Sequence, residues 1–164
     1  MQWFRHNNDM RHRPEMTYIA RALSAHGIAA TYALLEVFCD QCGSGENWKP
    51  TLRLEGAHSE QWLANEILLP DPDDDDETDT YGRPGVNRST KRLAEFLTTF
   101  ELAGLVQMGT ETTPGWKIVD GKKQTSDAME FTTITLLNAD GILDAWTARK
   151  LHAGRGQGNG GGRK

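Results

Sequence analysis

Hydrophobic residues recur along the first part of the chain with the spacing of two amphipathic helices. Pro14 is well placed to open the first helix, which Gly27 is expected to break. One face of this helix would be buried through Met16, Ile19, Ala20 and Leu23. The same spacing resumes at Ile28 and runs to Cys42, before the Gly-Ser-Gly run at 43–45. We therefore expect a second, longer helix that packs against the first.

The middle of the chain predicts a short strand and two further helices. Residues 51–55 alternate between polar and apolar as a strand does, and Ser59 can cap a third helix that Pro70 ends. Asn87 or Ser89 can cap a fourth helix. The apolar faces of these two helices are expected to enter the core through Trp62, Leu63, Ile67, Leu93, Phe96, Leu97 and Phe100.

The last part of the sequence predicts a small antiparallel sheet and one more helix. Gly104 suits the left-handed position that closes a helix. A turn at 113–115 and a loop at 120–127 are expected to separate the strands that follow. Strands are expected at residues 105–108, 116–119 and 131–136. Asn138 can cap a final helix whose inward side carries Ile142, Leu143 and Trp146.

This order of elements is typical of a winged helix-turn-helix, so we expect a mainly helical α+β fold. In helix-turn-helix proteins the second helix enters the DNA major groove, where its first residues reach phosphates and base edges. The residues that occupy this place here are Arg88, Ser89, Lys91 and Arg92. Lys122 and Lys123 lie near the expected wing tip, and Arg83 and Lys117 could extend the same basic surface. The alternative is that these bases form an ordinary solvated face.

Charge is distributed unevenly along the 164 residues, whose formal net charge is -5. Seven acidic residues stand between Pro70 and Asp79 without a basic one, and without them the chain would carry a positive balance. We therefore expect an acidic loop at 70–86, inserted into one winged-helix domain that covers residues 1–152. The glycine-rich segment 153–164 is basic and is expected to be a flexible tail that adds phosphate contacts or only solubility.

Signatures of common enzymes are absent from the sequence, which shows no phosphate-binding loop, dinucleotide fingerprint, zinc-protease helix or nucleophile elbow. We therefore expect a protein that is not an enzyme and needs no cofactor or metal. His6 and His12 stand near Asp9, but surface or structural roles are favoured for them. Cys39 and Cys42 could be half of a zinc site or a redox pair, although the missing second pair favours structural thiols.

The two cysteines and the polar first residues also bear on location. So few cysteines are typical of a reducing compartment, and no uninterrupted apolar stretch approaches the length of a membrane span. We therefore expect a cytoplasmic protein without a membrane partner. Many helix-turn-helix proteins act as dimers, so a homodimer stays open.

Three segments of the chain carry a recognisable pattern. The first opens with Trp3-Phe4-Arg5-His6-Asn7 and leads through Arg11 to Pro14, the second runs from Gly27 to the Tyr-Ala-Leu-Leu-Glu run that ends at Glu36, and the third is Leu93 to Val106. Together they resemble the N-terminal winged-helix module of phage replisome-organiser and DnaD-like replication proteins. The resemblance implies a winged-helix fold, and it implies DNA binding in replication initiation or its regulation, in a bacterial host cell. The acidic run is a departure from the family pattern.

The acidic run supports a second hypothesis. Dense like charges stay hydrated and favour an extended loop, which can regulate the DNA site by folding over Arg88 and its neighbours. Such a loop can also imitate nucleic-acid phosphates and occupy the basic channel of a nucleic-acid-binding protein or complex. The residues that would do so are Asp73, Asp74, Asp75, Asp76 and Glu77. In that case the chain would be a phage-encoded inhibitor, for example of the anti-CRISPR type.

Overall fold

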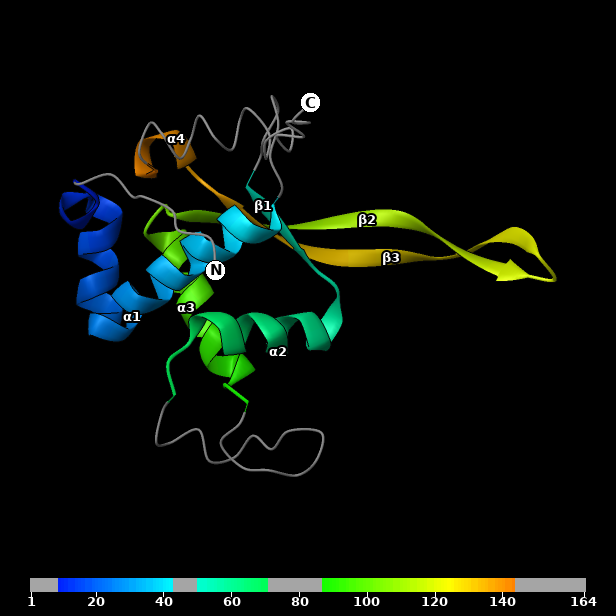
Figure 1. Ribbon diagram of the computed structural model, residues 1–164, viewed down its shortest axis with the longest axis horizontal. Coiled ribbons are helices and arrows are strands. Elements are labelled where there is room, and N and C mark those ends of the chain that lie inside the picture. Colours follow the sequence, from blue (N-terminus) through cyan, green and yellow to red (C-terminus); the bar gives the residue numbers. More distant parts are fainter. Residues whose placement is uncertain (1–8, 43–49, 71–86, 144–164) are drawn as a thin grey trace, which may run out of the picture.

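The computed structural model describes residues 9–42, 50–70 and 87–143 (Figure 1). Within them the chain is an α+β protein with more helix than strand and a small antiparallel sheet, which confirms the expected fold class at this level. A 3-10 turn at Met10–His12 is followed by α1 (Pro14–Gln41), β1 (Thr51–Leu54), α2 (Gly56–Ile67), α3 (Thr90–Leu102), β2 (Val106–Val119), β3 (Lys122–Leu136) and α4 (Ala139–Ile142). The acidic run Asp73 to Glu77, which was expected to form a loop, lies outside the described residues. So does the segment 153–164, which was expected to be a flexible tail.

The sheet has the strand order β1-β3-β2, with both neighbouring pairs antiparallel. Ile134 of β3 pairs with Leu52 on one side and with Met108 on the other. Because side chains alternate along a strand, Leu52, Leu54 and Ile134 all turn to one face, and they are buried there. The helices pack on this face, while the far part of the β2–β3 hairpin extends beyond them (Figure 1).

The core is built mainly from α1 and α3. The four residues expected on the inner face of α3, Leu93, Phe96, Leu97 and Phe100, are all buried. The rings of Phe96 and Phe100 meet edge to face, with their centroids 6.1 Å apart. The second half of α1 contributes Leu34, Leu35 and Phe38, which are also fully buried. In α2, Leu63 and Ile67 are buried as expected, and Trp62 is half-buried.

One sharp bend divides α1 into two segments that run in different directions (Figure 1). The bend is at Ser24, whose φ of 57° and ψ of -150° are not helical. The expected break at Gly27 is therefore wrong by three residues. Gly27 is buried in the second segment, where an added Cβ would lie 2.5 Å from Leu23 Cβ. Glycine is needed here for close packing across the bend.

The hairpin differs most from the sequence prediction, because β2 and β3 form one long ribbon. The expected turn at 113–115 is wrong: β2 continues through it, and the pairing only shifts register between Thr113 and Gly115. An added Cβ on Gly115 would lie in hard contact with Asp127 O, so this irregularity needs glycine. The expected loop at 120–127 is also wrong, because the chain turns at Asp120 and Gly121 and is already extended at Lys122.

Helix ends agree with the sequence at some places and not at others. Ser89 caps α3 as expected, with its hydroxyl accepting a hydrogen bond from Arg92 N over 3.2 Å. Gly104 has a φ of 78°, which is the left-handed conformation expected after that helix. Ser59 is not a cap, since α2 already begins at Gly56. Asn138 precedes α4 without a side-chain capping bond, and Trp146 lies outside the described residues.

The apolar character of α1 also meets a test for membrane spans by length and composition alone. Its most apolar window of 18 residues has a mean hydropathy of 1.4, and 44% of that window is buried inside the protein. Ile19, Leu34 and Phe38 of this helix are completely buried in the core. A core helix of this kind gives only weak evidence for a membrane span.

Candidate nucleic-acid interface

The start of α3 is held against α2 by polar side chains. Gln61 Nε2 donates to Arg88 O over 2.7 Å, and Arg88 N donates to Asn65 Oδ1 over 2.7 Å. Ser89 then caps the helix. Two of the residues predicted to contact DNA, Arg88 and Ser89, are thus half-buried parts of the α2–α3 corner. Their clearest role in the fold is to fix the direction in which α3 leaves that corner.

Lys91 and Arg92 differ in their surroundings although they are adjacent. Arg92 is half-buried, and its Nη1 donates to Leu69 O over 3.1 Å while its Nη2 lies 3.3 Å from His26 Nδ1. Its guanidinium also lies over the Phe96 ring, 5.4 Å from the centroid. Lys91 is exposed on the first turn of α3. Of the four predicted residues at this helix start, Lys91 is thus the basic side chain most open to an anion.

A small hollow separates α3 from the base of the hairpin and has a volume of about 200 Å³. The side of α3 that faces it carries the short side chains of Thr90, Ala94 and Thr98, one turn apart, above the buried Leu93 and Leu97, and Leu54 and the acidic Glu60 also line the hollow. Met108 of β2 and Thr132 of β3 line the opposite wall. Short side chains leave room for a bulky partner to approach the helix backbone, and threonine and alanine are compatible with contacts to DNA bases.

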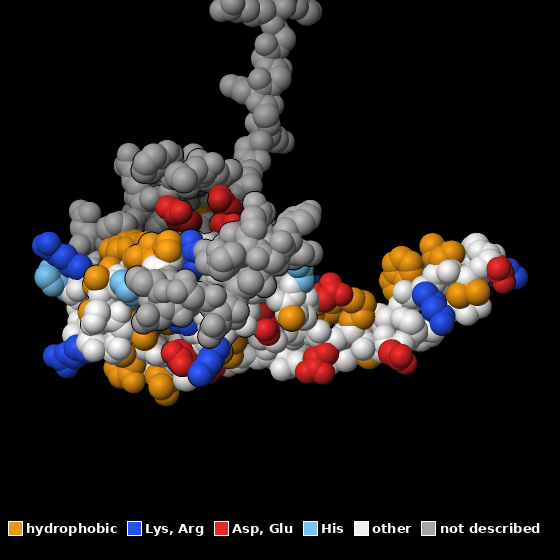
Figure 2. All heavy atoms as spheres, turned by 90° about the horizontal axis from the view of Figure 1, so that it is seen from below, with side chains coloured by type: hydrophobic (Ala, Val, Ile, Leu, Met, Phe, Trp, Pro, Cys, Tyr) orange, Lys and Arg blue, Asp and Glu red, His pale blue; other side chains and the backbone are white. Residues whose placement is uncertain are grey.

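The far end of the hairpin combines basic and apolar side chains. Lys117, Lys122 and Lys123 are exposed there, together with Trp116 and Ile118. Lys123 Nζ lies 4.5 Å from the centroid of the Trp116 ring. Figure 2 shows hydrophobic and basic side chains side by side at this end of the molecule. The predicted residues Lys122 and Lys123 thus lie beside the hairpin turn, and Lys117 joins them from the other strand.

Elsewhere on the described residues, acidic side chains outnumber basic ones. A second basic region lies at the opposite end of the long axis, at the bend of α1 (Figure 1). A hollow of about 340 Å³ lies at this bend. Arg11 and Arg21 line that hollow, above a floor that includes Met16 and Ile28. The hairpin end and the bend of α1 are therefore, besides the start of α3, described regions where an anionic partner meets more than one cation.

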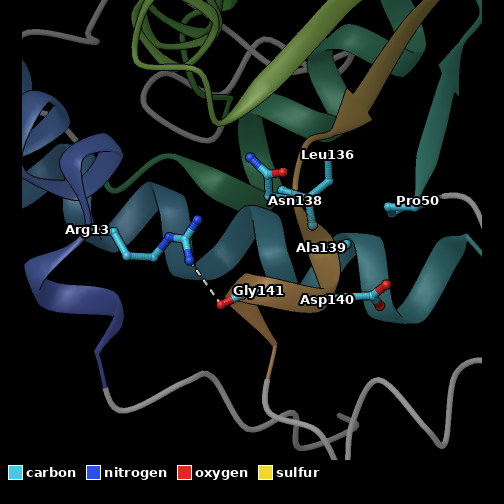
Figure 3. Close-up of a pocket in the computed structure, with 7 residues that line it drawn as sticks. All are labelled: Arg13, Pro50, Leu136, Asn138, Ala139, Asp140 and Gly141. Carbon is cyan, nitrogen blue, oxygen red and sulfur yellow. Dashed lines mark hydrogen bonds between the residues drawn. The ribbon is translucent and has the colours of Figure 1, made fainter.

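A third hollow, of about 500 Å³, lies between Arg13, at the start of α1, and the residues of α4 (Figure 3). Arg13 points across it and donates from Nη1 to Gly141 O over 3.1 Å, while its Nη2 pairs with Glu15 over 3.1 Å. This arginine joins α1 to α4. Pro50 and Leu136 form further walls of this hollow.

The cysteine pair does not have the surroundings of a reactive or metal-binding site in the part of the chain that is described. The pKa of the Cys42 thiol is raised from 9.0 to about 12, mainly by burial and also by the charge of Cys39, while a backbone hydrogen bond from Thr51 opposes both. A raised pKa disfavours the thiolate that metal binding and redox exchange require. No three His, Cys, Asp or Glu side chains among residues 9–42, 50–70 and 87–143 come together as metal ligands.

Sequence patterns missed Trp116 and Ile118 as surface residues. The run Trp116 to Val119 was expected to be a strand next to a turn, where apolar residues normally enter the core. The available signal was the Asp120-Gly121 pair, because Asp-Gly between strands is a strong hairpin-turn signal. With the turn placed there, Trp116 and Ile118 would have been assigned to the protruding end.

Comparison with known proteins gives no match: no family model fits the chain, and no curated protein and no solved structure is significantly similar to it.

Proposed function

We propose that this protein is a non-catalytic winged-helix protein that binds DNA. In this proposal α2 and α3 form the helix-turn-helix, and the β2–β3 hairpin is the wing. The support comes from the position of β1 between α1 and α2, from the hairpin that follows α3 directly, and from the strand order β1-β3-β2. The resemblance of three segments to replisome-organiser proteins supports a role in replication initiation or its regulation in the cytoplasm of a bacterial host.

The observation that carries DNA binding is the group of exposed lysines at the end of the hairpin. Lys117, Lys122 and Lys123 project from the side of a protein whose described surface is otherwise more acidic than basic. A polyanion is therefore attracted to this end and repelled from much of the remaining surface. With α3 in the major groove, the wing of such a protein lies along the adjacent DNA backbone, where lysines neutralise phosphates.

The six residues predicted from the sequence then divide into two roles. Lys91, Lys122 and Lys123 contact phosphates, and Lys117 joins them. Arg88, Ser89 and Arg92 act mainly by holding the start of α3 in place: the Arg88 backbone bonds Gln61 and Asn65, the Ser89 hydroxyl caps the helix, and the Arg92 side chain bonds Leu69 O. The short side chains of Thr90, Ala94 and Thr98 face the duplex across the hollow beside α3.

Salt-dependent binding of a labelled duplex tests this proposal. The logarithm of the binding constant falls with the logarithm of the salt concentration, with a slope of roughly 0.9 for each phosphate neutralised. The variant Lys117→Ala/Lys122→Ala/Lys123→Ala should bind more weakly and lose up to about 2.7 from that slope if every lysine holds one phosphate. The matched control, Arg11→Ala/Arg21→Ala, removes exposed cations from the opposite end and should bind as the wild type does.

Two results would overturn the proposal. One is a folded wild-type protein that binds no duplex at low salt. The other is a control variant at Arg11 and Arg21 that loses binding while the lysine variant keeps it, which would place the DNA at the bend of α1.

A further inference from the structure

Large apolar side chains are exposed at the end of the hairpin, where no described helix covers them (Figures 1 and 2). Trp116 is 57% exposed and Ile118 is 67% exposed. A hairpin needs neither residue at its tip for packing, since a two-stranded ribbon buries little there. Exposed apolar groups that are surrounded by polar ones commonly mark a binding surface. The lysines explain attraction to phosphates but leave these two side chains without a role.

The strand register determines how these residues are arranged on the ribbon. Trp116 pairs with Thr125 and Ile118 pairs with Lys123, and residues directly opposite each other share a face. Trp116, Ile118 and Lys123 therefore lie on one face, and Lys117 and Lys122 lie on the other. The ribbon thus carries positive charge on both faces and an aromatic ring on one.

The Trp116 ring is prepared for a flat partner. Lys123 Nζ lies over it at 4.5 Å, on one side of the indole, and the side chain is nevertheless 57% exposed. Much of the surface of Trp116 is thus open to a partner. An indole stacks well on the face of a nucleobase, and cations beside such a ring hold the neighbouring phosphates. In a duplex the base faces are covered by their neighbours, whereas unpaired bases expose them.

Other partners fit the same end less well. An anionic membrane would also attract these lysines, but its headgroups offer no flat face on which the Trp116 ring can stack. A second copy of the chain would bring the lysines of its own hairpin against Lys117, Lys122 and Lys123, and like charges repel. Unpaired nucleotides offer both the negative charge and the flat apolar faces that this surface complements.

We propose that Trp116 stacks on an unpaired base, so that the hairpin end binds single-stranded DNA or the junction between duplex and single strand. Ile118 lies against the neighbouring base, and the lysines on the two faces of the ribbon hold the phosphates on either side. This inference rests on the proposed DNA binding and adds to it the strand state that the protein prefers.

Binding of three labelled probes tests the inference: oligo(dT) of about 16 nucleotides, a duplex of the same length, and that duplex with an oligo(dT) overhang. Trp116→Ala should weaken binding to oligo(dT) and to the overhang by about 5- to 150-fold, which is the measured range for one base stacked on an aromatic ring. Duplex binding should change less than about twofold. Trp116→Phe should recover most of the loss. The control Tyr18→Ala removes an exposed aromatic side chain from α1, far from the hairpin, and should bind all three probes like the wild type.

Each other outcome counts against the inference in a distinct way. If Trp116→Ala binds all three probes as the wild type does, or loses affinity equally for all three, the ring does not stack on unpaired bases. If the loss appears instead with phosphatidylserine vesicles, the hairpin end is a membrane contact. Failure of the wild type to bind any probe would refute the proposed DNA binding itself. A circular dichroism melt that matches the wild type confirms that each variant is folded.

Discussion

Arg92 is expected to stabilise the fold rather than to contact DNA, and Arg92→Ala tests this. The change removes the hydrogen bond to Leu69 O, the contact with His26 Nδ1 and the cation over the Phe96 ring. The hydrogen bond has a charged donor, but it lies at a partly exposed site, so it contributes about 1 kcal/mol. The cation–π contact adds about 0.5–1 kcal/mol. Alanine recovers about 0.2 kcal/mol through its higher helix propensity. The free energy of unfolding should therefore fall by about 1–2 kcal/mol.

Urea unfolding followed by circular dichroism measures this change, and Lys91→Ala is the matched control on the next residue. Lys91 is exposed, so its replacement should alter the free energy of unfolding by less than about 0.5 kcal/mol. Duplex titration under conditions where both variants are folded should give the reverse order, with Lys91→Ala weakened more than Arg92→Ala. Unchanged stability of Arg92→Ala together with loss of DNA binding would show instead that Arg92 contacts DNA directly.

Three further predictions concern the bend of α1 and the thiol near its end. Ser24→Gly should raise the free energy of unfolding by about 1 kcal/mol, because glycine relieves the strain of a positive φ. This gain exceeds the extra chain entropy that glycine loses on folding, and a lower urea midpoint would contradict the prediction. Gly27→Ala should lower that free energy by about 1–3 kcal/mol, since the new Cβ would lie 2.5 Å from Leu23 Cβ, and an unchanged midpoint would show that the bend adapts. Cys42, whose pKa burial raises to about 12, should resist iodoacetamide in the folded protein near the ordinary thiol pKa of 9.0 and react once urea unfolds the chain. Equal alkylation rates in the two states, measured by mass spectrometry, would show that this thiol is not protected.

Local signals in the sequence predicted α3 and its two ends. Its inner face has an unbroken helical spacing from Leu93 to Phe100, a serine stands where the cap is needed, and Gly104 follows where the helix must close. Each of these signals acts within a few residues. The buried stripe and the helix boundaries therefore follow from the sequence without knowledge of the tertiary structure.

The bend of α1 and the shape of the hairpin depend on contacts between distant residues. Gly27 has the residue type of a helix breaker, but it is selected here by close packing against Leu23, and the break falls on Ser24. Pro114 and Gly115 have the residue types of a turn, but they lie where the hairpin shifts register, a place that tolerates both. A residue type alone does not separate a turn from a bulge or a close contact.

The candidate site was predictable only in part, because it too depends on contacts between residues far apart in the sequence. The basic residues at the start of α3 are visible in the sequence, but the engagement of Arg92 by Leu69 and His26 joins segments far apart in the chain. The exposure of Trp116 depends on how far the hairpin extends from the helices, which the misplaced turn concealed. Sequence patterns thus indicated where cations lie and not which of them are open to a partner.

Site-specific crosslinking tests most directly whether DNA lies along α3 and the hairpin. A cysteine introduced by Lys122→Cys, beside the hairpin turn, can carry a photoreactive label, because the raised pKa of Cys42 keeps that native thiol slow to react. Arg21→Cys places the same label at the bend of α1, at the opposite end of the protein. Duplex DNA should crosslink to position 122 and not to position 21, and excess salt should abolish the crosslink. Crosslinking at position 21 alone would contradict this expectation and would place the nucleic acid at the bend of α1.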